Sequence, residues 1–143
     1  DAVAAQIREQ LRGFLSLSAF EPLAQQWVAQ QGRAGKLPFQ PEVVGAHWSR
    51  RVQVDVVAIN WTEKQILLGE CKWGLDAIDR STMRELTEDK TPKVLADLPN
   101  GGEGWRVTQA LFTRRGITPA ARAAMQQQGG LVVDLERMDE ELG

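Results

Sequence analysis

Apolar positions recur at helical spacing at the start of the chain. Within residues 3–16 they fall at Ala4, Ile7, Leu11, Phe14 and Leu15, which predicts an amphipathic helix. A second helix is expected from a cap at Ser18 to about Gln31, with its end at Gly32. The basic stretch 32–41, which contains Gly and Pro, is typical of a loop.

The pattern then changes to one typical of strands. Short apolar segments predict strands at 43–49, 52–60 and 64–73. The middle strand alternates, with Val52, Val54 and Val56 on one face and Gln53, Asp55 and Val57 on the other. Because residues 60–64 form a plausible tight connection, we expect the last two strands to pair as an antiparallel hairpin.

The second half of the chain alternates helix and strand. Residues 75–98 have a helical period, with Pro92 as a candidate break. The Gly-rich segment 99–104 predicts a loop, and residues 106–113 a strand. Thr118 followed by Pro119 is typical of a capped helix start, and residues 131–135 predict a last strand. The expected order is α-α-β-β-β-α-β-α-β, an α/β fold.

Composition limits the class of protein. The 143 residues are 43% hydrophobic and 25% charged, as expected for one ordinary globular domain, and no apolar run is long enough to cross a bilayer. The single Cys71 excludes an internal disulfide and a cysteine zinc cage, so we expect a reducing, cytoplasmic location. A net charge of −2 argues against a constitutive nucleic-acid binder, although an enzyme that holds nucleic acid briefly is compatible with it.

One constellation of charged residues carries chemistry. Glu70 and Lys72 lie two apart in a strand and share a face, whereas Cys71 points to the other side. If residues 61–64 form the hairpin loop, Asn60 pairs with Gln65. Continuing this pairing along the two strands brings Asp55 opposite Glu70. Two carboxylates that face each other across antiparallel strands repel unless a cation or a proton lies between them.

Such a pair suits a hard cation. Mg²⁺ is typically bound through one or two carboxylates, and an adjacent ammonium can orient water and stabilise charge on a phosphate. The alternative is a solvated strand end, which is the usual meaning of an isolated Glu-x-Lys. These charges, however, stand within otherwise apolar strands, where carboxylates and lysines are rarely buried unless paired.

A family resemblance extends this interpretation. The segment 54–60, a short turn and Ile66-Leu-Leu-Gly-Glu-Cys-Lys-Trp73 resemble the core motif of the PD-(D/E)xK nuclease superfamily. His47-Trp48, Gly69–Trp73 and Leu111–Thr118 also resemble the nuclease-like C-terminal domain of archaeal-type AAA+ ATPases. The likeness covers roughly residues 17–135. It implies a central mixed sheet flanked by helices, with the α-β-β-β-α-β core of restriction endonucleases.

The resemblance implies roles for particular residues. Asp55 and Glu70 would bind Mg²⁺ or Mn²⁺, and Lys72 would be the catalytic lysine. Glu21 would add a third ligand from the preceding helix, although an acidic residue at a helix start also favours the helix dipole. Gln53 either lines the site or is a polar strand residue. We also name four candidates for nucleic-acid contacts, each of which has solvation or packing as its alternative role: Gln53, Arg50, Arg51 and Trp73.

Two functions of different classes therefore remain open, beside a purely structural network of ions. The first is metal-dependent hydrolysis of phosphodiester bonds in DNA by residues 17–143, with the 1–16 helix leading to an upstream module. The second is a nuclease-like binding module of an attached ATPase, with little activity of its own. The chain contains no Gly-x-x-x-x-Gly-Lys-Ser/Thr phosphate loop, so alone it should not hydrolyse ATP. We consider DNA, an ATPase domain upstream in the same chain and a second copy as partners, and no membrane.

Overall fold

A mixed β-sheet lies between two layers of helices in the computed structural model, which describes residues 17–46, 48–74 and 77–142. The described strands form a sheet of order β1-β2-β3-β4-β5, in which β1 to β3 are antiparallel and β3 to β5 are parallel. Their bounds are β1 Val43–Gly45, β2 Val56–Asn60, β3 Gln65–Lys72, β4 Arg106–Thr113 and β5 Leu131–Asp134. This confirms the expected α/β class with a central mixed sheet.

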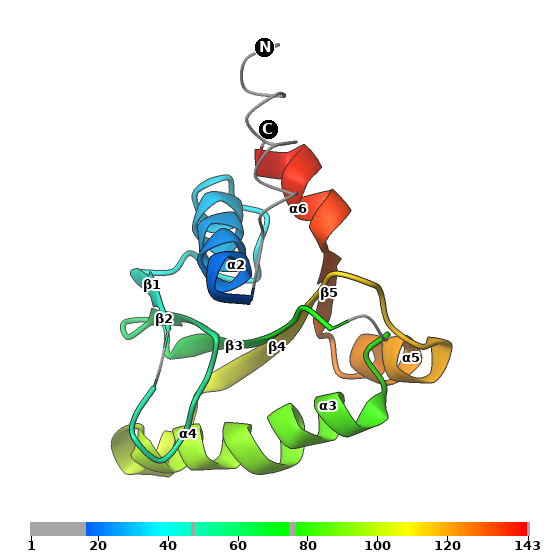
Figure 1. Ribbon diagram of the computed structural model, residues 1–143. Helices are drawn as coiled ribbons and strands as arrows, with labels where there is room; N and C mark the ends of the chain where they lie inside the picture. Colours follow the sequence, from blue (N-terminus) through cyan, green and yellow to red (C-terminus); the bar gives the residue numbers. More distant parts are fainter. Residues whose placement is uncertain (1–16, 47, 75–76, 143) are drawn as a thin grey trace.

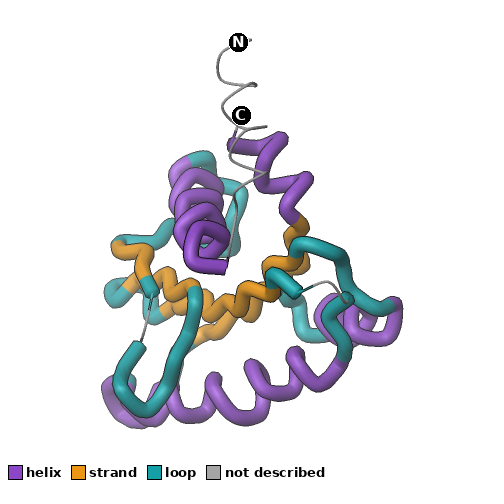
Figure 2. Tube along the Cα trace, in the orientation of Figure 1, coloured by secondary structure: helices purple, strands orange, loops and turns teal. Residues whose placement is uncertain are grey.

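Helices cover both faces of this sheet (Figures 1 and 2). Helices α2 (Leu17–Arg33) and α6 (Leu135–Leu142) lie on one face. On the other lie α5 (Pro119–Gln127) and one long helical run, made of α3 (Arg80–Arg84), the π-helical segment η1 (Glu85–Lys90) and α4 (Thr91–Asp97). A short 3-10 segment, η2 (Pro99–Gly102), follows α4. None of the described helices combines the length and the apolar character that crossing a bilayer requires.

Strand β3 is buried on both faces, and its side chains alternate between the two cores. Leu67 and Cys71 pack in the core beneath α2, whereas Ile66 and Leu68 pack in the core beneath the α3–α4 run. This alternation puts Glu70 and Lys72 on the α3–α4 side. The prediction that Cys71 faces away from them is therefore confirmed.

The register of the β2–β3 hairpin is the one expected. Asn60 pairs with Gln65, and the ladder continues to Val56 opposite Gly69. Residues 61–64 form the turn, which Lys64 closes with a positive φ of 56°. Strand β4 and the Thr118 cap of α5, whose hydroxyl accepts from the Ala121 amide at 3.3 Å, also follow the prediction.

The strand predicted at 52–60 is shorter than expected, because β2 begins only at Val56. Val52 and Val54 both pack in the α3–α4 core, whereas Val56 packs in the α2 core, so the alternation breaks at Asp55. Burial against the long helix, rather than ladder pairing, explains the apolar residues at 52–54. Gln53 consequently lies outside the strand and is exposed.

Other boundaries also differ from the prediction. Strand β1 ends at Gly45 rather than Ser49, because the chain leaves the sheet for α4, where the Trp48 indole donates to Asp97 at 2.9 Å. Helix α2 already includes Leu17, so Ser18 does not cap it, and it runs on to Arg33. Of the residues predicted to be helical at 75–98, the described ones enter the helix after the Asp79 cap and leave it at Asp97. The helix predicted at 3–16 lies outside the described residues.

Helix α6 was not predicted. Its apolar positions Leu135, Met138 and Leu142 have helical spacing, and the Asp134 carboxylate accepts from the Arg137 amide at 2.7 Å, as a capping residue does. The last strand is predicted to end at Leu135, which continues the apolar run of β5, and no element is predicted after it. The sequence therefore contains a helix start signal at Asp134, directly after the apolar residues of β5.

Gly69→Ala should destabilise the fold. A Cβ at position 69 would lie 2.8 Å from Cε2 of Phe112 and 3.2 Å from Cβ of Val56, both buried. Overpacking of this kind costs about 1–3 kcal/mol, which urea unfolding would measure. Gly45→Ala is the matched control, since nothing lies within 4 Å of its added Cβ, and its stability should stay within about 0.5 kcal/mol of the parent. Equal stability of the two variants would contradict this packing.

Candidate metal centre

Asp55 and Glu70 meet at the end of the β2–β3 hairpin. Asp55 immediately precedes β2, and the register that pairs Val56 with Gly69 brings it opposite Glu70. The Asp55 carboxylate accepts from the Cys71 amide at 2.8 Å, and its carbonyl accepts from the Gln25 side chain of α2 at 3.0 Å. The Asp55 carboxylate is close enough to Glu70 for its charge to raise the pKa of that carboxyl.

The environment of Glu70 perturbs its ionisation. Glu70 is only 6% exposed, and burial raises its pKa to about 7, with the neighbouring Asp55 carboxylate adding to the effect and Lys90 opposing it. Near neutral pH this carboxyl is therefore present in both its protonated and its charged form. A buried acid beside a second acid has the electrostatics expected of a functional site.

The ammonium that contacts Glu70 belongs to Lys90, which the sequence analysis missed. Lys90 Nζ lies 2.6 Å from Glu70 Oε1, and only 16% of the lysine side chain is exposed. A signal for it exists in the sequence, since Met83, Leu86, Lys90 and Val94 form one stripe at helical spacing. A charged residue on an otherwise apolar stripe implies a buried partner.

Cys71 and Lys72 follow Glu70 in β3, and their side chains have different environments. Lys72 is half-buried at the end of β3, and its ammonium forms no ion pair with a carboxylate in the part of the chain that the structure describes. Burial, together with the charges of Asp55, Glu21 and Glu70, raises the pKa of the Cys71 thiol far above its usual range. Such a thiol is a poor nucleophile, in agreement with its expected role as a core residue.

Glu21 belongs to α2, which lies on the face of the sheet toward which Cys71 points. Its charge acts on the Cys71 thiol, next to Glu70 in the sequence. The first turn of α2 as described contains no acidic residue, so the alternative role of Glu21 at the helix dipole does not apply. Within the described residues no three acidic, histidine or cysteine side chains gather as a metal-binding cluster. The structure thus assembles two carboxylates, and a third ligand from Glu21 stays a prediction.

The pair fits the chemistry of a magnesium or manganese site. Both residues offer carboxylate oxygens, and Mg²⁺ needs only one or two such ligands because it retains several waters. One Asp55 oxygen is held by the Cys71 amide, which fixes the orientation of the carboxyl. Outer hydrogen bonds of this kind orient metal ligands.

The residues proposed to contact nucleic acid are dispersed. Arg51 forms an ion pair with Asp97 at 2.5 Å, beside the loop that also carries the exposed Arg50. The Trp73 ring packs against Phe20 at 5.2 Å between centroids, and the Arg114 guanidinium lies 4.3 Å from its centre. Because the Trp73 ring already contacts Phe20 and Arg114, it is better suited to hold Arg114 than to stack on a base. The Arg114 amide donates to the Lys72 carbonyl at 3.1 Å, which places that arginine beside the site.

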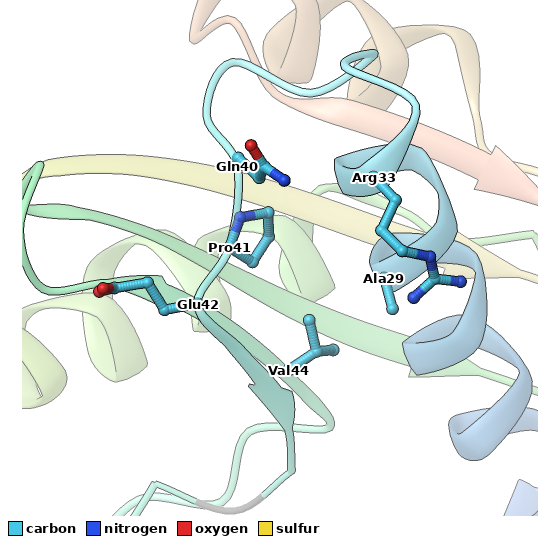
Figure 3. Close-up of a pocket in the computed structure, with 6 residues that line it drawn as sticks. All are labelled: Ala29, Arg33, Gln40, Pro41, Glu42 and Val44. Atoms are coloured by element: carbon cyan, nitrogen blue, oxygen red, sulfur yellow. The ribbon is translucent and has the colours of Figure 1, made fainter.

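A pocket of about 270 Å³ lies elsewhere, between the end of α2 and β1 (Figure 3). It is lined by Ala29, Arg33, Gln40, Pro41, Glu42 and Val44. The Glu42 carboxylate points away from it toward the hairpin turn, where it accepts from the Trp61 amide. With neither Asp55 nor Glu70 in its lining, this pocket is separate from the carboxylate pair.

Comparison with known proteins places the chain in a family. The model of DUF234, a family of archaeal and bacterial proteins of unknown function, matches residues 1–88, which is more than half of the chain. The chain belongs to the DUF234 family. The matched region includes both hairpin strands, and so both members of the carboxylate pair.

The chain is also similar to one protein in sequence and to one solved structure in fold. A segment of 54 residues is 33% identical to an uncharacterized protein of Methanocaldococcus jannaschii, and it covers 38% of this chain but 12% of that protein. Among solved structures, the crystal structure of a repair endonuclease from Pyrococcus abyssi aligns with a TM-score of 0.53 at 17% identity. The alignment covers 80% of this chain and 46% of that one. The DUF234 domain thus has a nuclease-like fold and spans less than half of each of these proteins.

Proposed function

We propose that this DUF234 domain is a metal-dependent nuclease-type domain that hydrolyses phosphodiester bonds in DNA. The observation that carries the proposal is the pair of carboxyl groups, Asp55 and Glu70, that meet across the hairpin of a nuclease-like fold. DNA as the substrate rests on the fold shared with a repair endonuclease. In line with the resemblance to ATPase-associated domains, the domain works as one part of a longer protein that contains an ATPase.

Asp55 and Glu70 hold the divalent cation in this proposal, with Glu21 approaching as a third acidic side chain. When bound, such a cation supplies positive charge for the phosphate oxygens and lowers the pKa of a coordinated water. Lys72, on the same face of β3 as Glu70, donates hydrogen bonds to the attacking water or to the phosphate.

Lys72→Met tests the role of the lysine. The variant should lose about 10²- to 10⁴-fold in the rate of Mn²⁺-dependent cleavage of duplex or branched DNA, as expected when a group that assists proton transfer is removed. Its affinity for Mn²⁺ should change little, because the two carboxylates remain. Lys36→Met, in an exposed loop, is the matched control and should cleave like the parent. Undiminished cleavage by Lys72→Met would contradict the proposal.

One observation favours a second candidate, a nuclease-like binding module attached to an ATPase. The Lys90 ammonium already occupies one oxygen of Glu70, one of the two candidate metal ligands. A parent protein that binds DNA in a gel-shift titration, but leaves it uncut at saturating Mn²⁺, would establish the binding module. Cleavage that requires Asp55 would establish the nuclease.

A further inference from the structure

Lys90 contacts Glu70 from the helical run that covers the same face of the sheet. Its ammonium lies 2.6 Å from Glu70 Oε1, with the carboxylate and lysine side chains 7% and 16% exposed. We propose that Lys90 is a positioning residue of the metal site, an internal counter-ion that must leave Glu70 when a divalent cation binds. This inference rests on the metal site of the proposed function and adds the residue that sets its affinity.

Competition follows from charge and shared atoms. A cation held by Asp55 and Glu70 needs oxygen lone pairs of Glu70, one of whose oxygens accepts from Lys90. A third positive charge beside a divalent ion in a poorly solvated site is unfavourable, because the repulsion is weakly screened there. Lys90 therefore stabilises the pair before metal arrives and weakens metal binding.

Hydrogen bonds of the next residue, Thr91, hold the turn that carries Lys90, so the movement that we propose is one of the lysine side chain. Lys90 ends the π-helical segment η1, directly before Thr91 and Pro92. The Thr91 hydroxyl donates to the Leu86 carbonyl at 2.8 Å and accepts from Gln109 of β4 at 3.4 Å. π-helical turns are frequent at functional sites, and this one accommodates Pro92, which lacks an amide to continue the ordinary ladder.

A second carboxylate lies within reach of the same ammonium. Glu85 Oε1 is 4.0 Å from Lys90 Nζ, and the Glu85 side chain is 55% exposed. A small rotation of the lysine would exchange the buried partner for this exposed one. Glu85 is therefore the position to which the ammonium moves when a cation takes Glu70.

Isothermal titration of the metal-free chain with Mn²⁺ alone tests the inference. Lys90→Met should bind Mn²⁺ at least about tenfold more tightly than the parent while melting at a lower temperature without metal. Lys93→Met is the matched control, since Lys93 lies on α4 but pairs with Asp89 at 3.0 Å, and its Mn²⁺ affinity should equal that of the parent. Glu85→Gln should bind Mn²⁺ about threefold more weakly. Lys90→Gln, which retains a hydrogen-bond donor, should follow Lys90→Met and replaces it if the methionine variant does not fold.

The outcomes separate this inference from the proposed function. Mn²⁺ binding that needs Asp55 but is equal or weaker in both Lys90 variants would overturn the competition and leave the metal site standing. An unchanged affinity of Glu85→Gln for Mn²⁺ would overturn the proposal that the Lys90 ammonium moves to Glu85. No Mn²⁺ binding by the parent or either Lys90 variant would overturn the metal site itself, and the inference with it.

Discussion

Asp55→Asn should abolish metal binding and DNA cleavage without unfolding the domain. The substitution removes the charge of one of the two carboxylates that meet at the hairpin end. Loss of a direct ligand should exceed the roughly 10- to 100-fold effect of removing an outer partner, both in Mn²⁺ affinity and in the cleavage rate. The rise in melting temperature that Mn²⁺ gives the parent through mass action should disappear.

The fold should survive because the substituted side chain keeps its structural contact. The Asp55 carboxylate accepts from the Cys71 amide at 2.8 Å, and the amide oxygen of asparagine can accept in the same way. The contact from Gln25 involves the backbone carbonyl, which the substitution leaves in place. Asp89→Asn is the matched control, because Asp89 is an exposed acid of η1 that pairs only at the surface with Lys93. If Asp55→Asn binds Mn²⁺ as tightly as Asp89→Asn, the site is not the metal centre.

Local pattern was sufficient to predict the hairpin, whereas the mixed class of the sheet was expected from the family resemblance. The loop at 61–64 fixed the register, and a strand alternation of two then determined which side of β3 carries Glu70. The Thr118–Pro119 start of α5 and the bounds of β4 are equally local, since a cap or an apolar run needs no distant partner. These features depend on residues close together in sequence.

Contacts between distant segments account for what the sequence did not reveal. Val52 and Val54 have the pattern of a strand but are buried against the long helix, so β2 is shorter than predicted. Lys90 reaches Glu70 only because β3 and the helical run pack together, with a π-helical turn before Pro92. An apolar stripe interrupted by a lysine identifies a buried charge, but the carboxylate that it meets follows from the tertiary structure.

Glu70 should make the stability of the metal-free domain fall as pH rises from about 4.5 to about 7. Burial raises its pKa from 4.5 to about 7. Between these values the unfolded chain has lost this proton while the folded chain retains it, so the folded state binds more protons and its free energy of unfolding decreases with pH. The full difference is about 3 kcal/mol, present above both pKa values and absent below both.

Glu70→Gln removes this dependence, because glutamine does not titrate. Urea unfolding at intervals from pH 4 to pH 8 in chelator should give a steeper decline for the parent than for the variant, with the two curves diverging between about pH 4.5 and 7. Glu88→Gln, at an exposed position of η1, is the matched control and should parallel the parent. Protons and Mn²⁺ compete for Glu70, so the stabilisation of the parent by Mn²⁺ should be larger at pH 8 than at pH 6. Parallel pH curves for the parent and Glu70→Gln would mean that the carboxyl titrates normally, and burial at the hairpin end would then not be what prepares it for a metal ion.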